Sequence, residues 1–590
     1  MKPEIVPRHP LTTEEAAALF PGLHPVLARA YAARRLTSPG ELEYGLANLA
    51  PHDRLKGIRE AARLLGDMIR KARRMLVIAD FDADGATSCA LAVRALRMMG
   101  GHVSYRVPNR FAYGYGLTPE IVAAVEDEEP DLIITVDNGI SSIEGVRAAR
   151  VRGIQVLVTD HHLPGAELPE ADVIVNPNQP GDGFPSKSMA GVGVIFYVMI
   201  ALRAHLRGQG WFAERGLPDP NLASLLDLVA LGTVADVVRL DYNNRILVAQ
   251  GLSRIRGDAC CTGIRALIRV AGRNQQRLVS ADLGFALGPR LNAAGRLEDM
   301  SLGVECLLCD DEEQALEMAL YLDELNRERR RIEKKMQQEA LQCLDHLDFD
   351  DVAARGPAGV CLYREDWHQG VIGILASRIK DRLHRPVIAF APAGGDELKG
   401  SARSVTGLNI RDVLEGVASR HPGLMNKFGG HAMAAGLSLP EAGYETFVQA
   451  FDEVVREFLG EEGLENVVLS DGALRPDEFT LELAEALRGG GPWGQGFPEP
   501  LFDGVFHIVE RRVVGGHHLK LRLTPDEAGT VIDAIAFNVE PHHPIHHAGS
   551  LHIAYRLDAN EYQGRCMPQL VIEHILDQWG GPGAARATPR

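Results

Sequence analysis

The stretch Met75–Ser88, MLVIADFDADGATS, decides the fold. Its first five residues are apolar and predict a buried β-strand. Gly85 then predicts a tight turn into a helix that Thr87 or Ser88 can cap. Alternate residues of an extended chain point the same way, so a divalent cation can compensate the repulsion between carboxylates on one face. A solvated acidic loop is the alternative. The carboxylates concerned are Asp80, Asp82 and Asp84.

Two later stretches have the same pattern of an apolar run followed by polar residues. Asp131–Val136 leads into Asp137-Asn138-Gly139, and Ile154–Thr159 leads into Asp160-His161-His162. Near-continuous β-branched runs separated by helical patterns are typical of a parallel sheet covered on both faces. Ligands of such sheets bind outside the carboxyl ends of the strands, where all three polar clusters fall.

A fourth acidic residue follows an apolar helical pattern. This residue is Asp236 in Leu231–Leu240, after the pattern Leu222–Ala230. Together the four stretches offer carboxylates and one or two imidazoles, which suits a two-metal hydrolytic centre.

The ordered set of short motifs resembles a known family. DFDADG, VDNGI, DHH and GTVADVV resemble the motifs of the DHH phosphoesterase superfamily, and FGGHAMAAG at Phe428–Gly436 resembles the glycine-rich motif of its partner domain, DHHA1. GPWGQGFPEPLF at Gly491–Phe502 and the segment after it narrow the match. From about Leu55 to Leu576 the chain resembles the RecJ family of single-strand-specific 5′→3′ DNA exonucleases.

The length of 590 residues predicts three or four domains. We expect an α/β protein with a parallel-sheet DHH domain and a smaller α/β DHHA1 domain joined by a long helix at Asp311–Leu344, plus a C-terminal oligonucleotide-binding (OB)-like β-barrel. The resemblance suggests that the N-terminal helices pack on the catalytic domain. The expected boundaries are 1–50 for an N-terminal helical segment, 51–265 for the DHH domain, 266–350 for connecting helices, 351–460 for DHHA1, 461–577 for the barrel and 578–590 for a tail.

Composition indicates a cytoplasmic protein. No apolar run reaches membrane-spanning length, the N-terminus is not a signal peptide, and the eight cysteines show no zinc-site pairing. The formal net charge of −17 argues against coating nucleic acid by bulk charge, so DNA contacts are expected at a few arginines and lysines.

The resemblance implies a role for each candidate ligand. Two Mn²⁺ or Mg²⁺ ions are expected, with Asp137 bridging them and Asp82 binding one. The other would be bound by Asp84, His161 and Asp236, while Asp80 supports the site. His162 and Arg290 would contact the scissile phosphate. Many relatives have a histidine two residues before the first aspartate, where this chain has Ile78, which leaves the preference between Mn²⁺ and Mg²⁺ open.

Several further residues are candidate substrate contacts. The loop Pro108–Leu117 carries a phosphate-binding arginine and a stacking tyrosine, unless it is an ordinary turn with partly buried tyrosines. Leu287–Leu297 contains small residues flanked by arginines, unless it is a helix-capping turn. Lys399–Ser404 is expected to form a phosphate-binding loop. The contacts named in these three stretches are Arg110, Tyr115, Arg290, Asn292, Arg296, Ser401 and Arg403.

Two more contacts come from the later motifs. His431 lies among glycines that permit close backbone approach, although tight packing explains those glycines nearly as well. Trp493 is a candidate for stacking on a base, unless it fills the barrel end. The barrel contains none of the expected metal ligands, so a chain ending near Gly460 is expected to keep its chemistry.

The resemblance implies a single-stranded-DNA-specific 5′–3′ exonuclease that releases 5′-mononucleotides by two-metal catalysis in DNA repair and recombination. Two alternatives remain: a DHH-family phosphodiesterase acting on short oligonucleotides or cyclic dinucleotides, and a non-catalytic DNA-binding scaffold. The resemblance implies a single-strand-binding protein and a RecQ-type helicase as partners, no membrane contact and a monomer.

Overall fold

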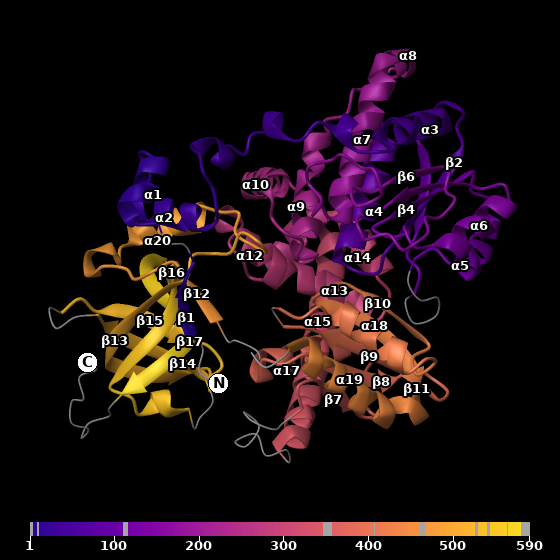
Figure 1. Cartoon of the computed structure of the whole chain (residues 1–590). Coiled ribbons are helices and arrows are strands. Elements are labelled where there is room, and N and C mark those ends of the chain that lie inside the picture. Colours follow the sequence, from indigo (N-terminus) through magenta and orange to yellow (C-terminus); the bar gives the residue numbers. More distant parts are fainter. Residues whose placement is uncertain are drawn as a thin grey trace. The chain divides into compact units, whose positions relative to one another are not determined.

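A computed structural model of the chain describes residues 4–8, 11–109, 116–345, 357–405, 407–459, 467–525, 529–539, 543–562 and 564–579. Arg110, Tyr115 and all but the first two residues of the expected tail lie outside these ranges. The chain forms two compact units (Figure 1). The larger unit contains residues 5–323 and 469–590, and the smaller unit contains residues 1–4 and 324–468.

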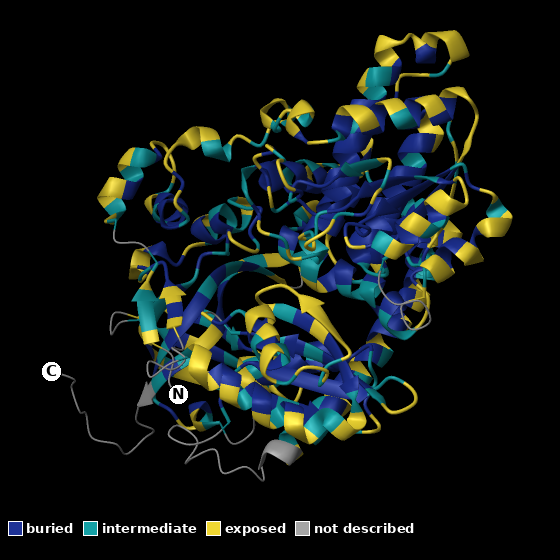
Figure 2. Ribbon diagram, turned by 45° about the vertical axis from the view of Figure 1, so that its right-hand side comes forward, coloured by how far each residue is buried: buried dark blue, intermediate teal, exposed yellow. Residues whose placement is uncertain are grey.

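A five-stranded parallel sheet forms the centre of the larger unit. Its strand order is β3-β2-β4-β5-β6, and each neighbouring pair is parallel. Every residue of β4 is buried, and the inner strands are dark blue in Figure 2, because helices cover both faces. The strands are β2 (Arg74–Ala79), β3 (His102–Arg106), β4 (Leu132–Val136), β5 (Gln155–Thr159) and β6 (Val173–Val175).

The helices on either side of the sheet complete its core (Figure 1). Ile78, Ile133 and Val158 point into the core on the side of α5 and α6, while α4 and α7 pack against the strands and each other. Among the described residues, α7 alone is long and apolar enough to cross a membrane, but 67% of that span is buried within the fold. These helices are α3 (Ile58–Arg70), α4 (Ala83–Met98), α5 (Pro119–Ala124), α6 (Ile143–Val151) and α7 (Gly191–Gly208).

Further helices extend the larger unit beyond the sheet. α12 and α13 belong to one helix that is interrupted by a π-helical turn, η7 (Leu283–Leu287). The stretch Leu287–Leu297 is therefore helical and not a capping turn. The helices are α8 (Trp211–Arg215), α9 (Leu226–Ala235), α10 (Tyr242–Arg256), α11 (Thr262–Val270), α12 (Ser280–Asp282), α13 (Gly288–Leu297) and α14 (Ser301–Leu308).

The C-terminal part of the larger unit is a closed barrel of five strands in the order β13-β14-β15-β17-β16. Leu519, Leu521 and Leu523 alternate along β14 and are buried inside it. The expected OB-like barrel is thus confirmed. Its strands are β13 (Phe502–Val514), β14 (His518–Thr524), β15 (Ile532–Ala536), β16 (Ser550–Tyr562) and β17 (Arg565–Trp579), and β12 (Val467–Ser470) and α20 (Leu481–Gly489) precede it.

The N-terminal segment contacts both the catalytic helices and the barrel side of the larger unit. Asn243 of α10 accepts a 3.0 Å hydrogen bond from the Ala50 backbone. The Arg34 guanidinium forms a buried 2.9 Å ion pair with Asp471. The segment therefore packs on the catalytic domain as expected, and it also contacts the barrel side, which the sequence did not predict. Its elements are β1 (Glu4–Pro7), α1 (Thr13–Leu19) and α2 (Pro25–Ala33).

The smaller unit is a second α/β domain with the strand order β10-β11-β9-β8-β7. Only β7 and β8 run parallel, and Phe390, Leu437 and Phe447 lie in its core. The expected long helix is confirmed as α15 (Glu312–Asp345). The strands are β7 (Val360–Tyr363), β8 (Val387–Pro392), β9 (Glu397–Arg403), β10 (Lys427–Gly430) and β11 (Ala434–Pro440), and the helices are α17 (Ile372–Leu383), α18 (Ile410–Arg420) and α19 (Tyr444–Leu459).

Candidate metal centre

The end of β2 delivers three carboxylates. Asp80 is buried directly after the strand. Asp82 caps α4, because its side chain accepts hydrogen bonds of 3.0 Å from the Asp84 and Gly85 backbone. The expectation that Thr87 or Ser88 caps this helix is wrong, since both lie inside α4 and Thr87 donates to the Ala83 carbonyl.

The Asp84 carboxylate lies at the N-terminus of α7. Its two oxygens accept hydrogen bonds of 2.6 Å from the Gly191 backbone and 2.9 Å from the Val192 backbone. The partial positive charge of a helix N-terminus favours a carboxylate there. Position 191 must be glycine, because an added Cβ would lie 2.6 Å from the Asp137 carboxylate.

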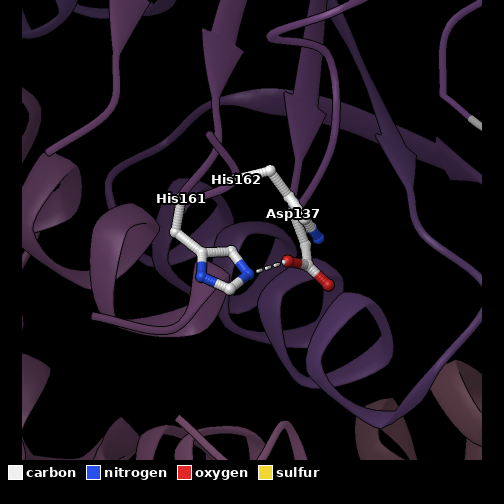
Figure 3. A group of neighbouring side chains, drawn as sticks. All are labelled: Asp137, His161 and His162. Carbon is white, nitrogen blue, oxygen red and sulfur yellow. Dashed lines mark ion pairs between the residues drawn. The ribbon is translucent and has the colours of Figure 1, made fainter. Parts of the chain in front are cut away.

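Asp137 follows β4 and turns back over the end of the strand with φ +63°. Its carboxylate oxygen lies 3.1 Å from His161 Nε2, and Figure 3 marks this ion pair with a dashed line. Asn138, which is 1% exposed, donates to the carbonyls of Ile78 and Val136 and joins the ends of β2 and β4. Asn138 therefore holds two ligand-bearing strand ends together.

Asp160 organises the third strand end, although we did not predict a role for it from the sequence. One oxygen accepts from the backbone of His161 and His162 and lies 2.8 Å from His162 Nδ1. The other oxygen accepts from the Ile140 backbone at 2.9 Å. Its position as the first residue of the Asp160-His161-His162 motif is the sequence feature that could have indicated this role.

Asp236 ends α9 and brings a further carboxylate to His161, at 3.4 Å from Nε2. His161 Nε2 also lies 4.0 Å from Asp84. The structure therefore brings all the expected ligands into two sets whose ligand atoms lie within 4.8 Å of one another: Asp80, Asp82 and Asp137, and Asp84, His161 and Asp236.

The chemistry of these donors fits a hard divalent cation. Carboxylate oxygens with one imidazole suit Mn²⁺ and Mg²⁺. Asp137 also approaches His161 and His162 within the same 4.8 Å limit, so it faces both sets. Ile78 is fully buried in the core of the sheet and offers no ligand, so the first carboxylate at this strand end is Asp80, directly after β2.

Burial and crowding raise the pKa of the central carboxylates. The pKa of Asp84 rises from 3.8 to about 7, chiefly because the group is buried and also because Asp82 is near. Burial and the neighbouring aspartates likewise raise the pKa of Asp137 and Asp236 well above the ordinary value. Burial and repulsion thus favour the protonated carboxyls, and a bound cation would favour their ionised forms.

His162 has the opposite electrostatic setting. Burial alone would lower its pKa, but the hydrogen bond and the charge of Asp160 outweigh burial and raise the pKa to about 9. His162 is therefore an imidazolium at neutral pH, with Nδ1 donating to Asp160. A fixed cation beside the metal ligands is suited to contact a phosphate oxygen.

The helix α13 packs against the Asp82–Asp84 turn. Asn292 accepts a 2.8 Å hydrogen bond from the Ala83 backbone, so it supports the ligand loop. Arg290 is mostly buried and lies 2.8 Å from the buried carboxylate of Asp323 in α15. Arg296 is half-buried on the same helix.

Trp493 is not available for stacking on a base. It is 8% exposed, its ring stacks on Tyr31 and Phe497 at 5.7 and 5.0 Å between centroids, and its Nε1 donates to the Leu487 carbonyl. The Ser280 hydroxyl donates to its carbonyl. Trp493 therefore joins the N-terminal segment, the catalytic helices and the barrel side. The expectation that it stacks on a base is corrected, because its ring is buried.

A second cluster lies in the smaller unit. Ser401 and Arg403 belong to the strand β9, so the expectation of a phosphate-binding loop there is wrong. Arg403 donates to Ser401 Oγ at 3.1 Å, and among the described residues it has no carboxylate partner. An added Cβ at Gly373, in the first turn of α17, would lie 2.8 Å from the guanidinium. His431 is exposed in the turn between β10 and β11.

The fold and the ligand sets define a metal-dependent phosphoesterase of the DHH class. Family models match the DHH family N-terminal domain at residues 74–233, the DHHA1 domain at 356–457 and the RecJ OB domain at 470–574. The chain belongs to the RecJ family of single-stranded-DNA-specific exonucleases. The expected family and fold class are thereby confirmed.

Similarity to this family extends over nearly the whole chain. The single-stranded-DNA-specific exonuclease RecJ of Dickeya dadantii is 56% identical over 96% of this chain and 98% of its own length. RecJ of Escherichia coli is 54% identical over 95% of this chain and 97% of its own length. The crystal structure of Thermus thermophilus RecJ with Mn²⁺ has a TM-score of 0.78 and 29% identity, covering 99% of this chain and 81% of that one.

Proposed function

We propose that this exonuclease degrades single-stranded DNA from its 5′ end and releases 5′-mononucleotides by two-metal catalysis. The observation that carries the proposal is the position of Asp137, whose carboxylate approaches both ligand sets. Relatives named single-stranded-DNA-specific exonuclease support the substrate, and solved RecJ structures in complex with Mn²⁺ and with Mg²⁺ support a divalent cation.

Each ligand set is assigned one cation, and Asp137 is shared between them. Bound cations would lower the pKa of a coordinated water and offset charge on the phosphate. In the chain itself, Asn138 and Asp160 hold the strand ends so that the ligands converge. The ligands of the first cation are Asp80 and Asp82, and those of the second are Asp84, His161 and Asp236.

His162 and Arg290 are assigned to the scissile phosphate. The pKa of His162 is raised to about 9, because Asp160 stabilises the imidazolium. With Nδ1 bound to Asp160, Nε2 can donate a hydrogen bond to the phosphate. Arg290 has its guanidinium oriented by Asp323. Charge-assisted donors aimed at developing negative charge stabilise a transition state. Asn292 supports the Asp82–Asp84 turn. Arg296 is proposed to contact the sugar-phosphate backbone of the DNA farther from the scissile phosphate.

The terminal phosphate is assigned to Arg403 and Ser401. Burial lowers the pKa of Arg403, and its only described side-chain partner is a hydroxyl. A half-buried guanidinium without a carboxylate is suited to an anion, and glycine at position 373 lets the start of α17 pack directly against it. Capture of a 5′-phosphate by this cluster, with His431 on the neighbouring hairpin, would set the 5′→3′ direction.

A cleavage assay with end-labelled DNA tests the activity and separates it from the alternatives. With Mn²⁺ we expect loss of nucleotides from single strands, and no turnover of duplexes or cyclic dinucleotides. Asp137→Asn should abolish cleavage, whereas Asp127→Asn, an exposed carboxylate away from the site, should not. Turnover of only the dinucleotide, or binding of single strands without cleavage, would refute the proposal.

Direction is tested by comparing 5′-phosphorylated with 5′-hydroxyl strands. Arg403→Ala should raise KM for the phosphorylated strand and leave the hydroxyl strand unchanged, because only the first has the anion that Arg403 binds. Arg290→Ala should lower kcat on both substrates. An equal rise in KM on both strands for both variants would contradict the assignment.

We further propose that the protein acts as a cytoplasmic monomer in DNA repair and recombination, with a single-strand-binding protein and a RecQ-type helicase as partners. Family membership is the support. The proposed division of labour places metal chemistry in residues 51–265, connecting helices in 266–350, end capture in 351–460 and strand binding in 461–577. Light scattering and co-purification with each partner test these assignments, and a stable dimer would refute the monomer.

A further inference from the structure

Phe285 is a large apolar side chain that the fold leaves in water. It is 80% exposed, although its neighbours Leu283, Ala286 and Leu287 in the same turn are buried. Exposure of a phenylalanine forgoes the stabilisation that burial would give. The turn that carries it, η7, is π-helical, and π-helical turns inside α-helices are frequent at functional sites.

The helix that carries Phe285 contacts the ligand-bearing parts of the metal centre. An added Cβ at Gly284 would lie 3.2 Å from Val234 Cγ1, and one at Gly288 would lie 3.1 Å from the Ala235 Cβ, so η7 packs on the end of α9 just before Asp236. The same helix continues to Asn292, which binds the Ala83 backbone. Phe285 thus belongs to an element in contact with two strand or helix ends that carry candidate ligands.

A second exposed apolar residue lies on the neighbouring element. Val237 directly follows Asp236, is 65% exposed and has φ +61°. A left-handed backbone is a strained exception for a β-branched residue, and such strain concentrates at functional sites. Two exposed apolar side chains therefore lie at backbone irregularities, Phe285 in η7 and Val237 just beyond the end of α9.

We infer that Phe285, with Val237 on the adjoining element, forms the contact surface for a nucleobase of the bound strand near the cleaved phosphate. The inference rests on the proposed function. Along a single strand each phosphate is followed by a base, so a site with cations for the phosphate needs an apolar partner for the base. Every base has a π-face, so stacking is tolerant of sequence, as an enzyme that shortens any strand requires.

The test combines substitution of Phe285 with removal of a single base from the DNA strand. Phe285→Ala and Phe285→Tyr are compared with the wild type on 5′-phosphorylated strands in which one abasic residue is moved along the first nucleotides. The control is Val151→Ala, which removes an equally exposed side chain at 82% from the end of α6. Phe285→Ala should raise KM about tenfold, which is typical of losing one stacked base. Phe285→Tyr should restore the wild-type KM.

The abasic series distinguishes base contact from a structural role. At one position the abasic residue should weaken wild-type cleavage by a similar factor and should add nothing to Phe285→Ala, because the two changes remove the same contact. Additive losses at every position, or no loss in Phe285→Ala, overturn the inference. Failure of the wild type to degrade single strands would instead refute the proposed function. The melting temperature should be unchanged, since the removed side chain is mostly in water.

Discussion

Removal of divalent cations should make the stability of the protein fall as pH rises. In the metal-free site Asp84 keeps its proton to a pKa of about 7, compared with 3.8 in the unfolded chain. The folded chain therefore binds more protons between these values, so the stabilisation is complete below about pH 4 and is lost as pH rises through 7. The raised pKa values of Asp137 and Asp236 act in the same direction.

The size of the effect follows from Asp84 alone. Its raised pKa removes about 3 kcal/mol of unfolding free energy between pH 5 and pH 8. For a cooperative unit as large as residues 5–323 and 469–590, that corresponds to a fall in Tm of about 3 °C. His162 adds to the same trend, because its pKa is raised from 6.5 to about 9 and its contribution is also lost on raising pH. Asp160 has a lowered pKa, so it titrates below this range.

Thermal melting in EDTA and in saturating Mn²⁺, at pH 5 and pH 8, measures the effect. The gain from Mn²⁺ should be larger at pH 8, because bound cations compensate ionised carboxylates. Asp137→Asn in EDTA should melt above the wild type at pH 8 and close to it at pH 5, whereas Asp127→Asn should follow the wild type. A metal-free Tm that is constant or rises from pH 5 to pH 8 would refute the reasoning.

Three further predictions follow from other contacts. Asp160→Asn should lower activity relative to the wild type progressively from pH 6 to pH 9, because His162 loses the carboxylate that retains its proton; a constant ratio in a pH–rate profile would count against this. Asp323→Ala should lower the free energy of unfolding in urea by about 3 kcal/mol, because it leaves the Arg290 charge buried without the Asp323 carboxylate. The double variant with Arg290→Ala should lose less than the sum of the two single losses. Trp493→Ala should cost about 3–5 kcal/mol and leave kcat on a short strand intact; wild-type stability with weaker binding of DNA would instead return Trp493 to a substrate role.

Burial of Trp493 also changes the expectation for a chain that ends near Gly460. Such a chain would lose Trp493 and Phe497 and would expose Tyr31 and Arg245, whose guanidinium lies 4.4 Å from the Phe497 ring centroid. The barrel shares one compact unit with the catalytic domain. The truncated protein is therefore expected to be destabilised, although the barrel supplies none of the metal ligands.

The sequence by itself determined the parts of this protein that depend on local pattern. Apolar runs of strand length placed β2, β4 and β5, and the polar residues after each run marked the ligand-bearing ends, because parallel strands end at one edge of their sheet. The sequence also indicated a β-barrel after residue 461 and a long helix at Asp311–Leu344, which is α15. Such patterns are legible because each depends on residues close in the chain.

The tertiary structure alone decided which distant groups meet. Asp84 accepts hydrogen bonds from the start of α7, more than a hundred residues away, and Arg290 pairs with Asp323 of the next long helix. Ser401 and Arg403 are held by strand pairing, and Trp493 is buried by the N-terminal segment. A side chain's partners depend on how the elements pack, and that packing brings together residues whose separation along the chain carries no periodic signal.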